Sequence, residues 1–243
     1  MKAVLRWLGL VVLALLALQL FFLLRIALMS TFDPESTTFQ RSEAWRIATE
    51  KHRLAWRQQW VPYEQISDHL KRAVIASEDG SFVNHDGVDW DALDKAWSRN
   101  AKAEEQAAKR AQLAPTRVKP AKVVGGSTIT QQLAKNLLLS GERNLLRKGQ
   151  ELVLTMVLEH TLSKQRILEI YLNSVEWGEG VFGAEAAAQH YYRKSAALLS
   201  PYESARLAVM LPRPRYFEKL PNSGYLSSRA STIAARMRDA GLP

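Results

Sequence analysis

The sequence predicts an all-α, or at least predominantly α-helical, domain that is preceded by one transmembrane helix. Residues 7–24 are 18 consecutive uncharged and mostly apolar positions, close to the lower length limit for a helix that spans a bilayer. In the rest of the chain apolar residues recur with helical spacing, and no alternating run is long enough for a substantial strand. With 243 residues and 47% hydrophobic content, the chain can form one compact domain beside this membrane segment.

Charged residues around the apolar run indicate how it would lie in a membrane. Lys2 and Arg6 precede it, which favours a cytoplasmic N-terminus and an exported C-terminal domain, and Arg25 can reach the outer interface. A cleaved signal peptide is the alternative, but the run is long for one and no clear small-x-small cleavage site follows it. We therefore expect an uncleaved, single-pass anchor and four parts of the chain: a cytoplasmic tail (1–6), a transmembrane anchor (7–29), a juxtamembrane connector (30–60) and an exported domain (61–243).

Composition narrows the partners that the exported domain can have. The net charge of +9 and the sequence pI near 9.8 suit a polyanion or an anionic surface. The two candidates are nucleic acid and an anionic membrane that carries pyrophosphate-bearing substrates. An exported domain rarely meets nucleic acid, so we expect the membrane and no nucleic acid. The chain has no cysteine, so no disulfide forms and no redox indication of its compartment exists.

Helical periodicity and helix-end signals predict a series of helices in the exported part. The expected spans are 67 to about 80, 89–108, 128–139, 145–162, 164–173, 184–192, 201–210 and 227–240.

Two segments depart from this pattern. Residues 40–60 are charged and contain Trp45, Trp56 and Trp60, which favours a position near the membrane interface, although some of these rings can simply pack on the core. Residues 100–124 are basic and contain two prolines, which predicts a frayed helix that continues as a mobile loop. A solvated insertion and a contact with lipid headgroups are both compatible with this composition.

Residues 125–136 (GGSTITQQLAKN) place polar side chains where a plain helix has no need of them. Beside an apolar stripe that recurs every four residues, Thr128, Gln132 and Lys135 form a second, polar stripe. Uncharged donors next to a cation could bind a phosphorylated sugar. The alternative is a capping box between Thr128 and Gln131, which needs no ligand.

Two adjacent carboxylates, Glu78 and Asp79, fall at the end of the helix that begins at Ser67. A helix C-terminus carries partial negative charge, so the pKa of a carboxyl there should be raised, which indicates a function that uses the shift. The alternative is that both acids face solvent near a turn, with Phe82 packed in the core and His85 capping the loop.

A third cluster lies in the helix predicted at 145–162. Arg147 and Glu151 are four residues apart and so share a helix face, with Lys148 beside them. Arg147 can bind phosphate through its planar guanidinium, and Lys148 supplies a compact charge. The alternative is a surface salt bridge between Arg147 and Glu151, worth roughly a few tenths of a kcal/mol. Glu159, further along, suits a partly buried ion pair.

In their order along the chain, these blocks resemble the motifs of the family 51 glycosyltransferases, the peptidoglycan glycosyltransferases that polymerise lipid II. The blocks are residues 78–87 (EDGSFVNHDG), 125–136, 147–151 (RKGQE) and 164–192, and the resemblance covers roughly residues 61–217. The short chain with one anchor is similar to the stand-alone, monofunctional members of that family. The resemblance implies a lysozyme-like α-helical lobe, a small membrane-touching lobe, and a cleft between them for two lipid-linked substrates.

The resemblance also implies a reaction. The enzyme would join lipid II units into β-1,4-linked glycan strands with inversion and would release undecaprenyl pyrophosphate. Glu78 would be the general base on the 4-hydroxyl of the acceptor N-acetylglucosamine, and Glu151 the second catalytic acid. Pyrophosphate is a good leaving group, so cations can replace a proton donor. The other motif positions would bind substrate: Asp79, Phe82, His85, Thr128, Gln132, Lys135, Asn136, Arg147 and Lys148.

Carboxylates next to phosphates favour Mg²⁺ or Mn²⁺, and the resembled family commonly uses one. We expect this divalent cation to be recruited with the substrate pyrophosphate, with Glu78 and Glu151 as candidate protein ligands. The histidines are scattered, so no zinc site is expected. The implied setting is the bacterial cytoplasmic (inner) membrane with a periplasmic catalytic domain. The implied partners are lipid II, the growing lipid-linked glycan, and other cell-wall synthesis or division proteins.

Two other functions stay open on the sequence alone. A lytic transglycosylase or muramidase needs one catalytic Glu but neither the phosphate-binding cations nor a membrane-held site. A non-catalytic, membrane-anchored partner of cell-wall assembly would keep the polar residues only as supports of the fold. No Ser-x-x-Lys and no Lys-Thr-Gly sequence occurs, so transpeptidase and penicillin-binding activity is expected to be absent.

Overall fold

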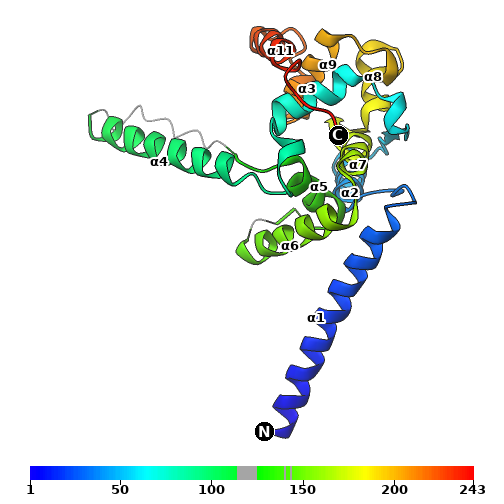
Figure 1. The fold of residues 1–243 in the computed structure, drawn as a ribbon, viewed down its shortest axis with the longest axis vertical. Helices are drawn as coiled ribbons and strands as arrows, with labels where there is room; N and C mark the ends of the chain where they lie inside the picture. The colour runs from blue at the N-terminus through cyan, green and yellow to red at the C-terminus, as the bar shows by residue number, and fades with distance from the viewer. Residues whose placement is uncertain (114–124, 140, 143) are drawn as a thin grey trace.

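A computed structural model shows a helical domain from which two long helices project, one of them at the N-terminus (Figure 1). The structure describes residues 1–113, 125–139, 141–142 and 144–243. The α-helices are α1 (Lys2–Leu28), α2 (Thr38–Lys51), α3 (Asp68–Glu78), α4 (Trp90–Leu113), α5 (Ile129–Leu138), α6 (Leu145–Thr161), α7 (Lys164–Ser174), α8 (Ala184–Tyr192), α9 (Pro201–Met210), α10 (Pro214–Glu218) and α11 (Gly224–Arg236). The predominantly α-helical fold class is thus confirmed.

Short elements complete the description. Among the described residues, the 3-10 helices are η1 (Tyr63–Gln65), η2 (Phe82–Asn84) and η4 (Ala196–Leu198), and the short strands are β1 (Arg57–Gln58), β2 (Glu176–Gly178) and β3 (Val181–Phe182). The strands form one small sheet in the order β1-β3-β2, in which β3 runs parallel to β1 and antiparallel to β2.

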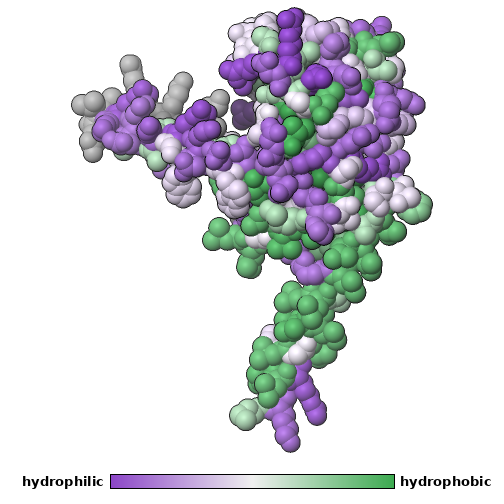
Figure 2. Space-filling view, viewed as in Figure 1, coloured by the Kyte–Doolittle hydropathy of each residue, from purple (hydrophilic) through white to green (hydrophobic). Residues whose placement is uncertain are grey.

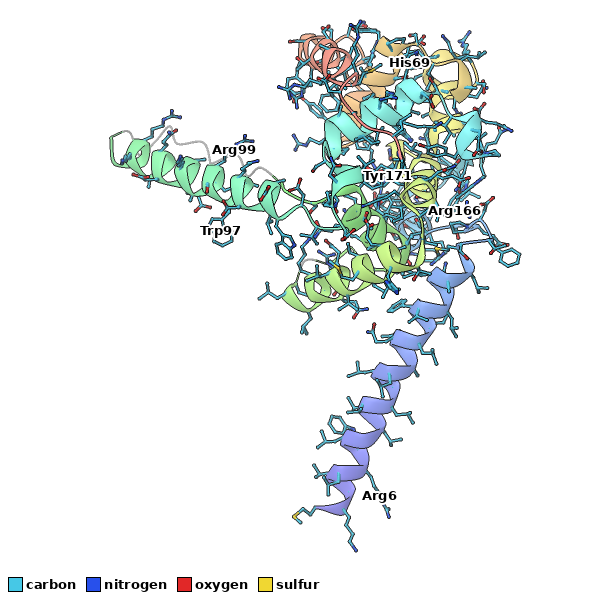
Figure 3. The ribbon with its side chains drawn as sticks, viewed as in Figure 1. Arg6, His69, Trp97, Arg99, Arg166 and Tyr171 are labelled. Atoms are coloured by element: carbon cyan, nitrogen blue, oxygen red, sulfur yellow. The ribbon has the colours of Figure 1, made fainter. Side chains whose placement is uncertain are left out.

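Helix α1 is apolar and exposed along most of its length, and it is long enough to cross a membrane. Its last turn, however, belongs to the domain. Ile26 is fully buried and Met29 is 3% exposed, and both pack into the main hydrophobic core. Arg166 Nε donates a hydrogen bond of 2.8 Å to the Met29 carbonyl at this junction (Figure 3).

The domain has two groups of packed helices around one continuous core. Helices α3, α9 and α11 pack together at the end far from α1, and α5 packs against α2, α6 and α7 nearer to α1. Helix α4 leaves the domain sideways (Figure 1). The ends of α3, α5 and α6 therefore lie near the start of α4. The motif residues lie at these helix ends.

The glycines of the 164–192 block shape the backbone around the small sheet. Gly180 has φ +72°, and a Cβ there would lie 2.3 Å from the Ala55 carbonyl oxygen. Gly183 has φ +83°, and a Cβ there would lie 2.6 Å from the Asn173 carbonyl oxygen. A side chain at either position would be strained and would clash with backbone, so both positions need glycine.

Most predicted helices agree with the structure. The spans of α5 to α9 match to within one residue at each end, and α11 begins three residues and ends four residues earlier than predicted. The helix predicted over 89–108 extends further than expected, because α4 continues to Leu113. Alanine is a strong helix former and Glu105 pairs with Lys109 at 2.7 Å, so nothing interrupts the helix before Pro115. The predicted loop from 114 to 124 lies outside the described residues.

The predicted connector, 30–60, contains two elements that sequence reasoning missed. Helix α2 packs on α5, and β1 pairs with β3. A capping box between Thr37 and Gln40 begins α2, but only Gln40 and Ile47 of the helix are buried, so its apolar periodicity is weak. The boundary at residue 60 and the proximity of this segment to the membrane stay predictions.

Candidate active site

Glu78 is the last residue of α3 and lies at the edge of the cleft described below. Its Oε2 accepts a hydrogen bond of 3.1 Å from Gln132 Nε2, and its Oε1 lies 3.4 Å from the Ser77 hydroxyl. Burial raises the pKa of the Glu78 carboxyl, the negative charge of Asp79 adds to the rise, and the two hydrogen bonds oppose it. The predicted direction is confirmed, with burial as its main cause. A carboxyl with a raised pKa suits general-base chemistry.

Asp79 is buried and is used by its protein neighbours. Its Oδ2 accepts the backbone N–H of Ile129 at 3.0 Å, and its Oδ1 lies 2.9 Å from His85 Nε2. Asp79 thus caps the first turn of α5 and joins it to the turn after α3. The ring of Phe82 is fully buried and meets the His85 ring edge-on, with centroids 6.4 Å apart.

These contacts change the interpretation of the 78–87 block. Phe82 has no exposed surface with which to touch a ligand, so we assign it a packing role instead of the predicted substrate contact. The side chain of His85 is only 9% exposed, and its Nδ1 is buried without a partner among the described residues. Asp79, Phe82 and His85 are largely buried directly after Glu78 in the chain, so they restrict the position of Glu78.

Gln132 lies between the carboxylate and the interior of the domain. Its amide nitrogen donates to Glu78, and its amide oxygen accepts a hydrogen bond of 3.0 Å from the Tyr171 hydroxyl. Tyr171 belongs to α7, is fully buried, and lies in the middle of the domain (Figure 3). Burial and the nearby Glu78 and Asp79 raise the Tyr171 pKa, so this hydroxyl stays a donor. The orientation of the Gln132 amide is therefore set by Tyr171.

Thr128 begins α5 through the capping box that the sequence left as an alternative. Its hydroxyl accepts from Gln131 N at 3.2 Å, its own N–H donates to Gln131 Oε1 at 3.1 Å, and its hydroxyl donates to the Gly87 carbonyl at 2.6 Å. The capping box is thus confirmed. Thr128 is 3% exposed, so its hydroxyl mainly joins α5 to the 78–87 block.

The first turns of α6 carry the predicted phosphate-binding group. Asn144 caps the helix by accepting from Arg147 N at 2.7 Å. Glu151 is 3% exposed and receives Arg147 Nη1 at 2.9 Å and Lys148 Nζ on its other oxygen. The pair is therefore a buried ion pair rather than the surface salt bridge of the alternative. Arg147 Nε is buried and has no hydrogen-bond partner among the described residues.

Three adjoining cavities form one cleft around these residues. A cavity of about 500 Å³ is lined by Gln132, Lys135, Arg147, Lys148 and Glu151. A second, of about 360 Å³, shares Gln132, Lys135 and Arg147 with it and reaches Asn136. A third, of about 210 Å³, contains Glu78 and meets the first at Ser127. The N-terminus of α6 opens into this cleft, and a helix N-terminus favours anions.

The third cavity also contains two cations that sequence reasoning missed. Lys95 and Arg99 of α4 line it opposite Glu78, and they share a helix face because they are four residues apart. Arg99 and Trp97 leave α4 on opposite sides (Figure 3). This alternation of basic and aromatic faces was the available signal, but the basic composition of the whole 100–124 segment obscured it. Glu159, in contrast, forms the predicted ion pair, with Lys164 at 2.8 Å.

The geometry of the cleft also bears on which residues could hold the predicted divalent cation. Among the described residues, no three His, Cys, Asp or Glu side chains gather as a metal site. Both oxygens of Glu151 are already paired with cations. The residues therefore do not form a protein-held cage, and a cation bound here would depend on the substrate for most of its ligands.

A carboxylate with a raised pKa and several cations that line one cleft are an arrangement typical of an enzyme active site. Comparison with known proteins agrees, because the family model described as Transglycosylase matches residues 46–238. The chain belongs to this transglycosylase family, and the predicted family, glycosyltransferase class and lysozyme-like helical fold are confirmed.

Curated relatives match the chain over nearly its whole length. The biosynthetic peptidoglycan transglycosylase of Burkholderia thailandensis is 52% identical over 246 residues, which cover 100% of this chain and 90% of the relative. The protein of the same name from Herminiimonas arsenicoxydans is 50% identical over 100% of this chain and 99% of its own length. That of Paraburkholderia xenovorans is 49% identical, covering 98% and 94%.

Proposed function

We propose that this chain is a membrane-anchored, inverting glycosyltransferase that polymerises lipid II into β-1,4-linked peptidoglycan strands without transpeptidation. The observation that carries the proposal is the position of Gln132. One side of this residue holds the Glu78 carboxylate, and the other side lines the cavity of Lys135 and Arg147. A base and a cation group thus face the same space, and the names of the relatives support the synthetic direction.

Glu78 would start the reaction. Its carboxylate takes the proton from the 4-hydroxyl of the acceptor N-acetylglucosamine as the hydroxyl oxygen attacks the anomeric carbon of the donor. Partial burial and the raised pKa make Glu78 a better proton acceptor than a solvent-exposed carboxylate. Gln132, oriented by Tyr171, fixes which oxygen of Glu78 points into the cleft.

The cations would stabilise the negative charge of the leaving group. As the bond from the anomeric carbon to the phosphate oxygen breaks, negative charge grows on undecaprenyl pyrophosphate. Lys135, Arg147 and Lys148 line the cavity that this charge would occupy. Fixed donors at the place where charge develops lower the barrier most. Mg²⁺ or Mn²⁺ that arrives with the pyrophosphate would add to this neutralisation.

The membrane placement follows from α1 and the surface beside it. Hydrophobic residues cover α1 and continue onto the adjacent part of the domain (Figure 2). This part includes Leu145 and Leu146 of α6, which are 90% and 89% exposed. We place α1 across the bacterial inner membrane with Arg6 at its cytoplasmic end (Figure 3) and the domain on the periplasmic side. Burial of Ile26 in the core supports an uncleaved anchor.

The test is to supply the purified full chain with labelled lipid II in detergent and, separately, with purified sacculi. Glycan ladders from lipid II and no soluble fragments from sacculi are expected. Fragments without ladders would establish a lytic enzyme instead, and neither product from a folded sample would favour a non-catalytic partner.

A further inference from the structure

Helix α1 contains one glutamine that faces the domain. Gln19 is partly buried, whereas its neighbours Leu18 and Leu20 are exposed. Its Nε2 donates to Gln150 Oε1 at 2.9 Å, and its Oε1 accepts from Gln150 Nε2 at 3.0 Å. The two amides therefore exchange both hydrogen bonds across 131 residues of sequence.

The depth of this amide pair follows from helix geometry. Gln19 lies nine residues before Leu28, the end of α1, which corresponds to about 13 Å along the helix axis. It lies six residues, or about 9 Å, below Arg25, whose guanidinium reaches the Ser36 carbonyl at the end of the anchor. With α1 across a hydrocarbon layer of about 30 Å, the pair lies inside that layer. Water does not compete for amides there, and an unpaired amide is costly.

Gln150 belongs to the helix that carries the phosphate-binding group. On α6 it shares a face with Leu146, four residues before it, and Val153, three residues after it, and both are exposed. Glu151 is the next residue, a quarter turn away, and points into the cleft. A fixed position of Gln150 relative to α1 therefore fixes the depth of Arg147, Lys148 and Glu151 in the membrane interface.

We propose that the Gln19–Gln150 amide pair is a positioning device that sets the height of the α6 cations relative to the headgroups of the lipid-linked substrate. The inference rests on the proposed function and on the placement of α1 across the membrane. In this view the anchor is part of the active-site architecture and not only a tether, because its amide decides where the pyrophosphate meets Arg147.

The first experiment is a double-mutant cycle in lipid nanodiscs with the full chain. Gln19→Leu and Gln150→Leu should each lower the rate of lipid II polymerisation by about three- to fifteen-fold, the range expected for a hydrogen bond between membrane helices. The double variant should be no slower than either single variant, because both remove the same interaction. Gln165→Leu is the matched control, since it removes a different glutamine hydrogen bond at an exposed site and should leave the rate unchanged.

Bilayer thickness supplies a readout that a merely structural role would not move. The rate of lipid II polymerisation by the native chain should have a clear optimum when the acyl-chain length of the nanodisc lipid is varied. A bilayer that is too thin or too thick displaces a cleft of fixed depth from the lipid headgroups. In Gln19→Leu and Gln150→Leu the optimum should flatten, with the change mainly in the apparent KM for lipid II. Equal optima for native and variant chains, or multiplicative effects in the double variant, would overturn the proposal.

A cross-link tests the contact independently of activity. The chain has no cysteine, so Gln19→Cys with Gln150→Cys can be treated in membranes with a short bis-methanethiosulfonate reagent. A cross-link is expected for this pair and not for Leu13→Cys with Gln150→Cys, because Leu13 lies about 9 Å lower on α1. No cross-link would refute the contact. A cross-link in the Gln19→Cys, Gln150→Cys chain, together with a native chain that makes no glycan from lipid II, would instead refute the proposed function and leave the contact standing.

Discussion

Glu78 and Glu151, the two predicted catalytic carboxylates, have opposite surroundings in the cleft. Glu78 is half-buried and its hydrogen-bond partners are uncharged, an amide and a hydroxyl. Glu151 is almost fully buried and both of its oxygens meet cations. The uncharged partners leave Glu78 able to take up a proton, while the cations occupy Glu151 and are held by it. With the proposed function, Glu78 and Glu151 would have separate tasks, one in proton transfer and one in placing positive charge.

The strongest test of this division is Glu78→Gln, which keeps the shape of the side chain and removes the base. Polymerisation of lipid II should fall by roughly 10²- to 10⁴-fold, the usual contribution of a general base. Thermal unfolding of the variant should occur at the native temperature or above it, because a neutral amide avoids the cost of burying a charge. Glu64→Gln, at an exposed carboxylate, serves as the control and should keep full activity. A Glu78→Gln enzyme within tenfold of native would contradict the assignment of the base.

The charge-placing half of the comparison is tested at Arg147. Arg147→Ala should lower kcat by about 100-fold, as expected for loss of a fixed donor to a developing anion. Arg147→Lys should fall between this variant and native, since an ammonium keeps the charge but loses the planar fork. Steady-state kinetics with labelled lipid II measure both effects, and Arg229→Ala, an exposed arginine, is the control. Equal rates for Arg147→Lys and native would show that the fork is not used.

Removal of divalent cations should have a smaller effect. Because the described residues form no cage of their own, EDTA should slow polymerisation by roughly fivefold and Mg²⁺ or Mn²⁺ should restore it at once. The melting temperature should be the same with and without EDTA, because no three His, Cys, Asp or Glu side chains gather among the described residues to hold a structural metal. A drop in melting temperature with EDTA would reveal a protein-held ion and would contradict this arrangement.

The smallest expected effect concerns the pH dependence of the base. A base works only when unprotonated, so kcat/KM should rise with pH through the Glu78 pKa, which burial holds above its ordinary value. The Gln132 hydrogen bond lowers that pKa, so Gln132→Leu should move the acidic limb toward higher pH. On that limb we expect a loss of about threefold that disappears at high pH.

Tyr171→Phe is the matched variant for this measurement. It keeps the buried ring and removes only the hydroxyl that orients the Gln132 amide, so the acidic limb should shift in the same direction by less. An acidic limb that does not move in Gln132→Leu would mean that another group sets the pH dependence.

Local signals in the sequence predicted much of the helical part of the fold. Ser163, Ser200 and Thr128 cap α7, α9 and α5 through their own side chains, and a cap acts within one turn of sequence. The small sheet could not be predicted, because its strands are two or three residues long and β1 pairs with β3 across more than 100 residues of sequence. Helix α2 was not predicted for a related reason: only two of its residues are buried, so the sequence shows little apolar periodicity there.

The candidate site divides in the same way. The cation group on α6 could be predicted because its members lie within one helical turn, and the structure joins them in one ion-paired cluster. The packing of Phe82 and His85 stood only as an alternative in the sequence, because the residues that bury them come from elsewhere in the chain. Likewise, no local pattern places Tyr171 beneath Gln132, or Lys95 and Arg99 opposite Glu78. Which polar motif residues face the cleft is decided by tertiary packing.

The burial of Ile26 and Met29 has a consequence for how the protein is made. With α1 placed across the membrane as proposed, a core that includes the last turn of α1 cannot close until that turn has left the translocation machinery. On that placement, folding of the domain and insertion of α1 would be completed together. A fragment that starts after Met29 would fold with two cavities in its interior, where Ile26 and Met29 pack in the full chain.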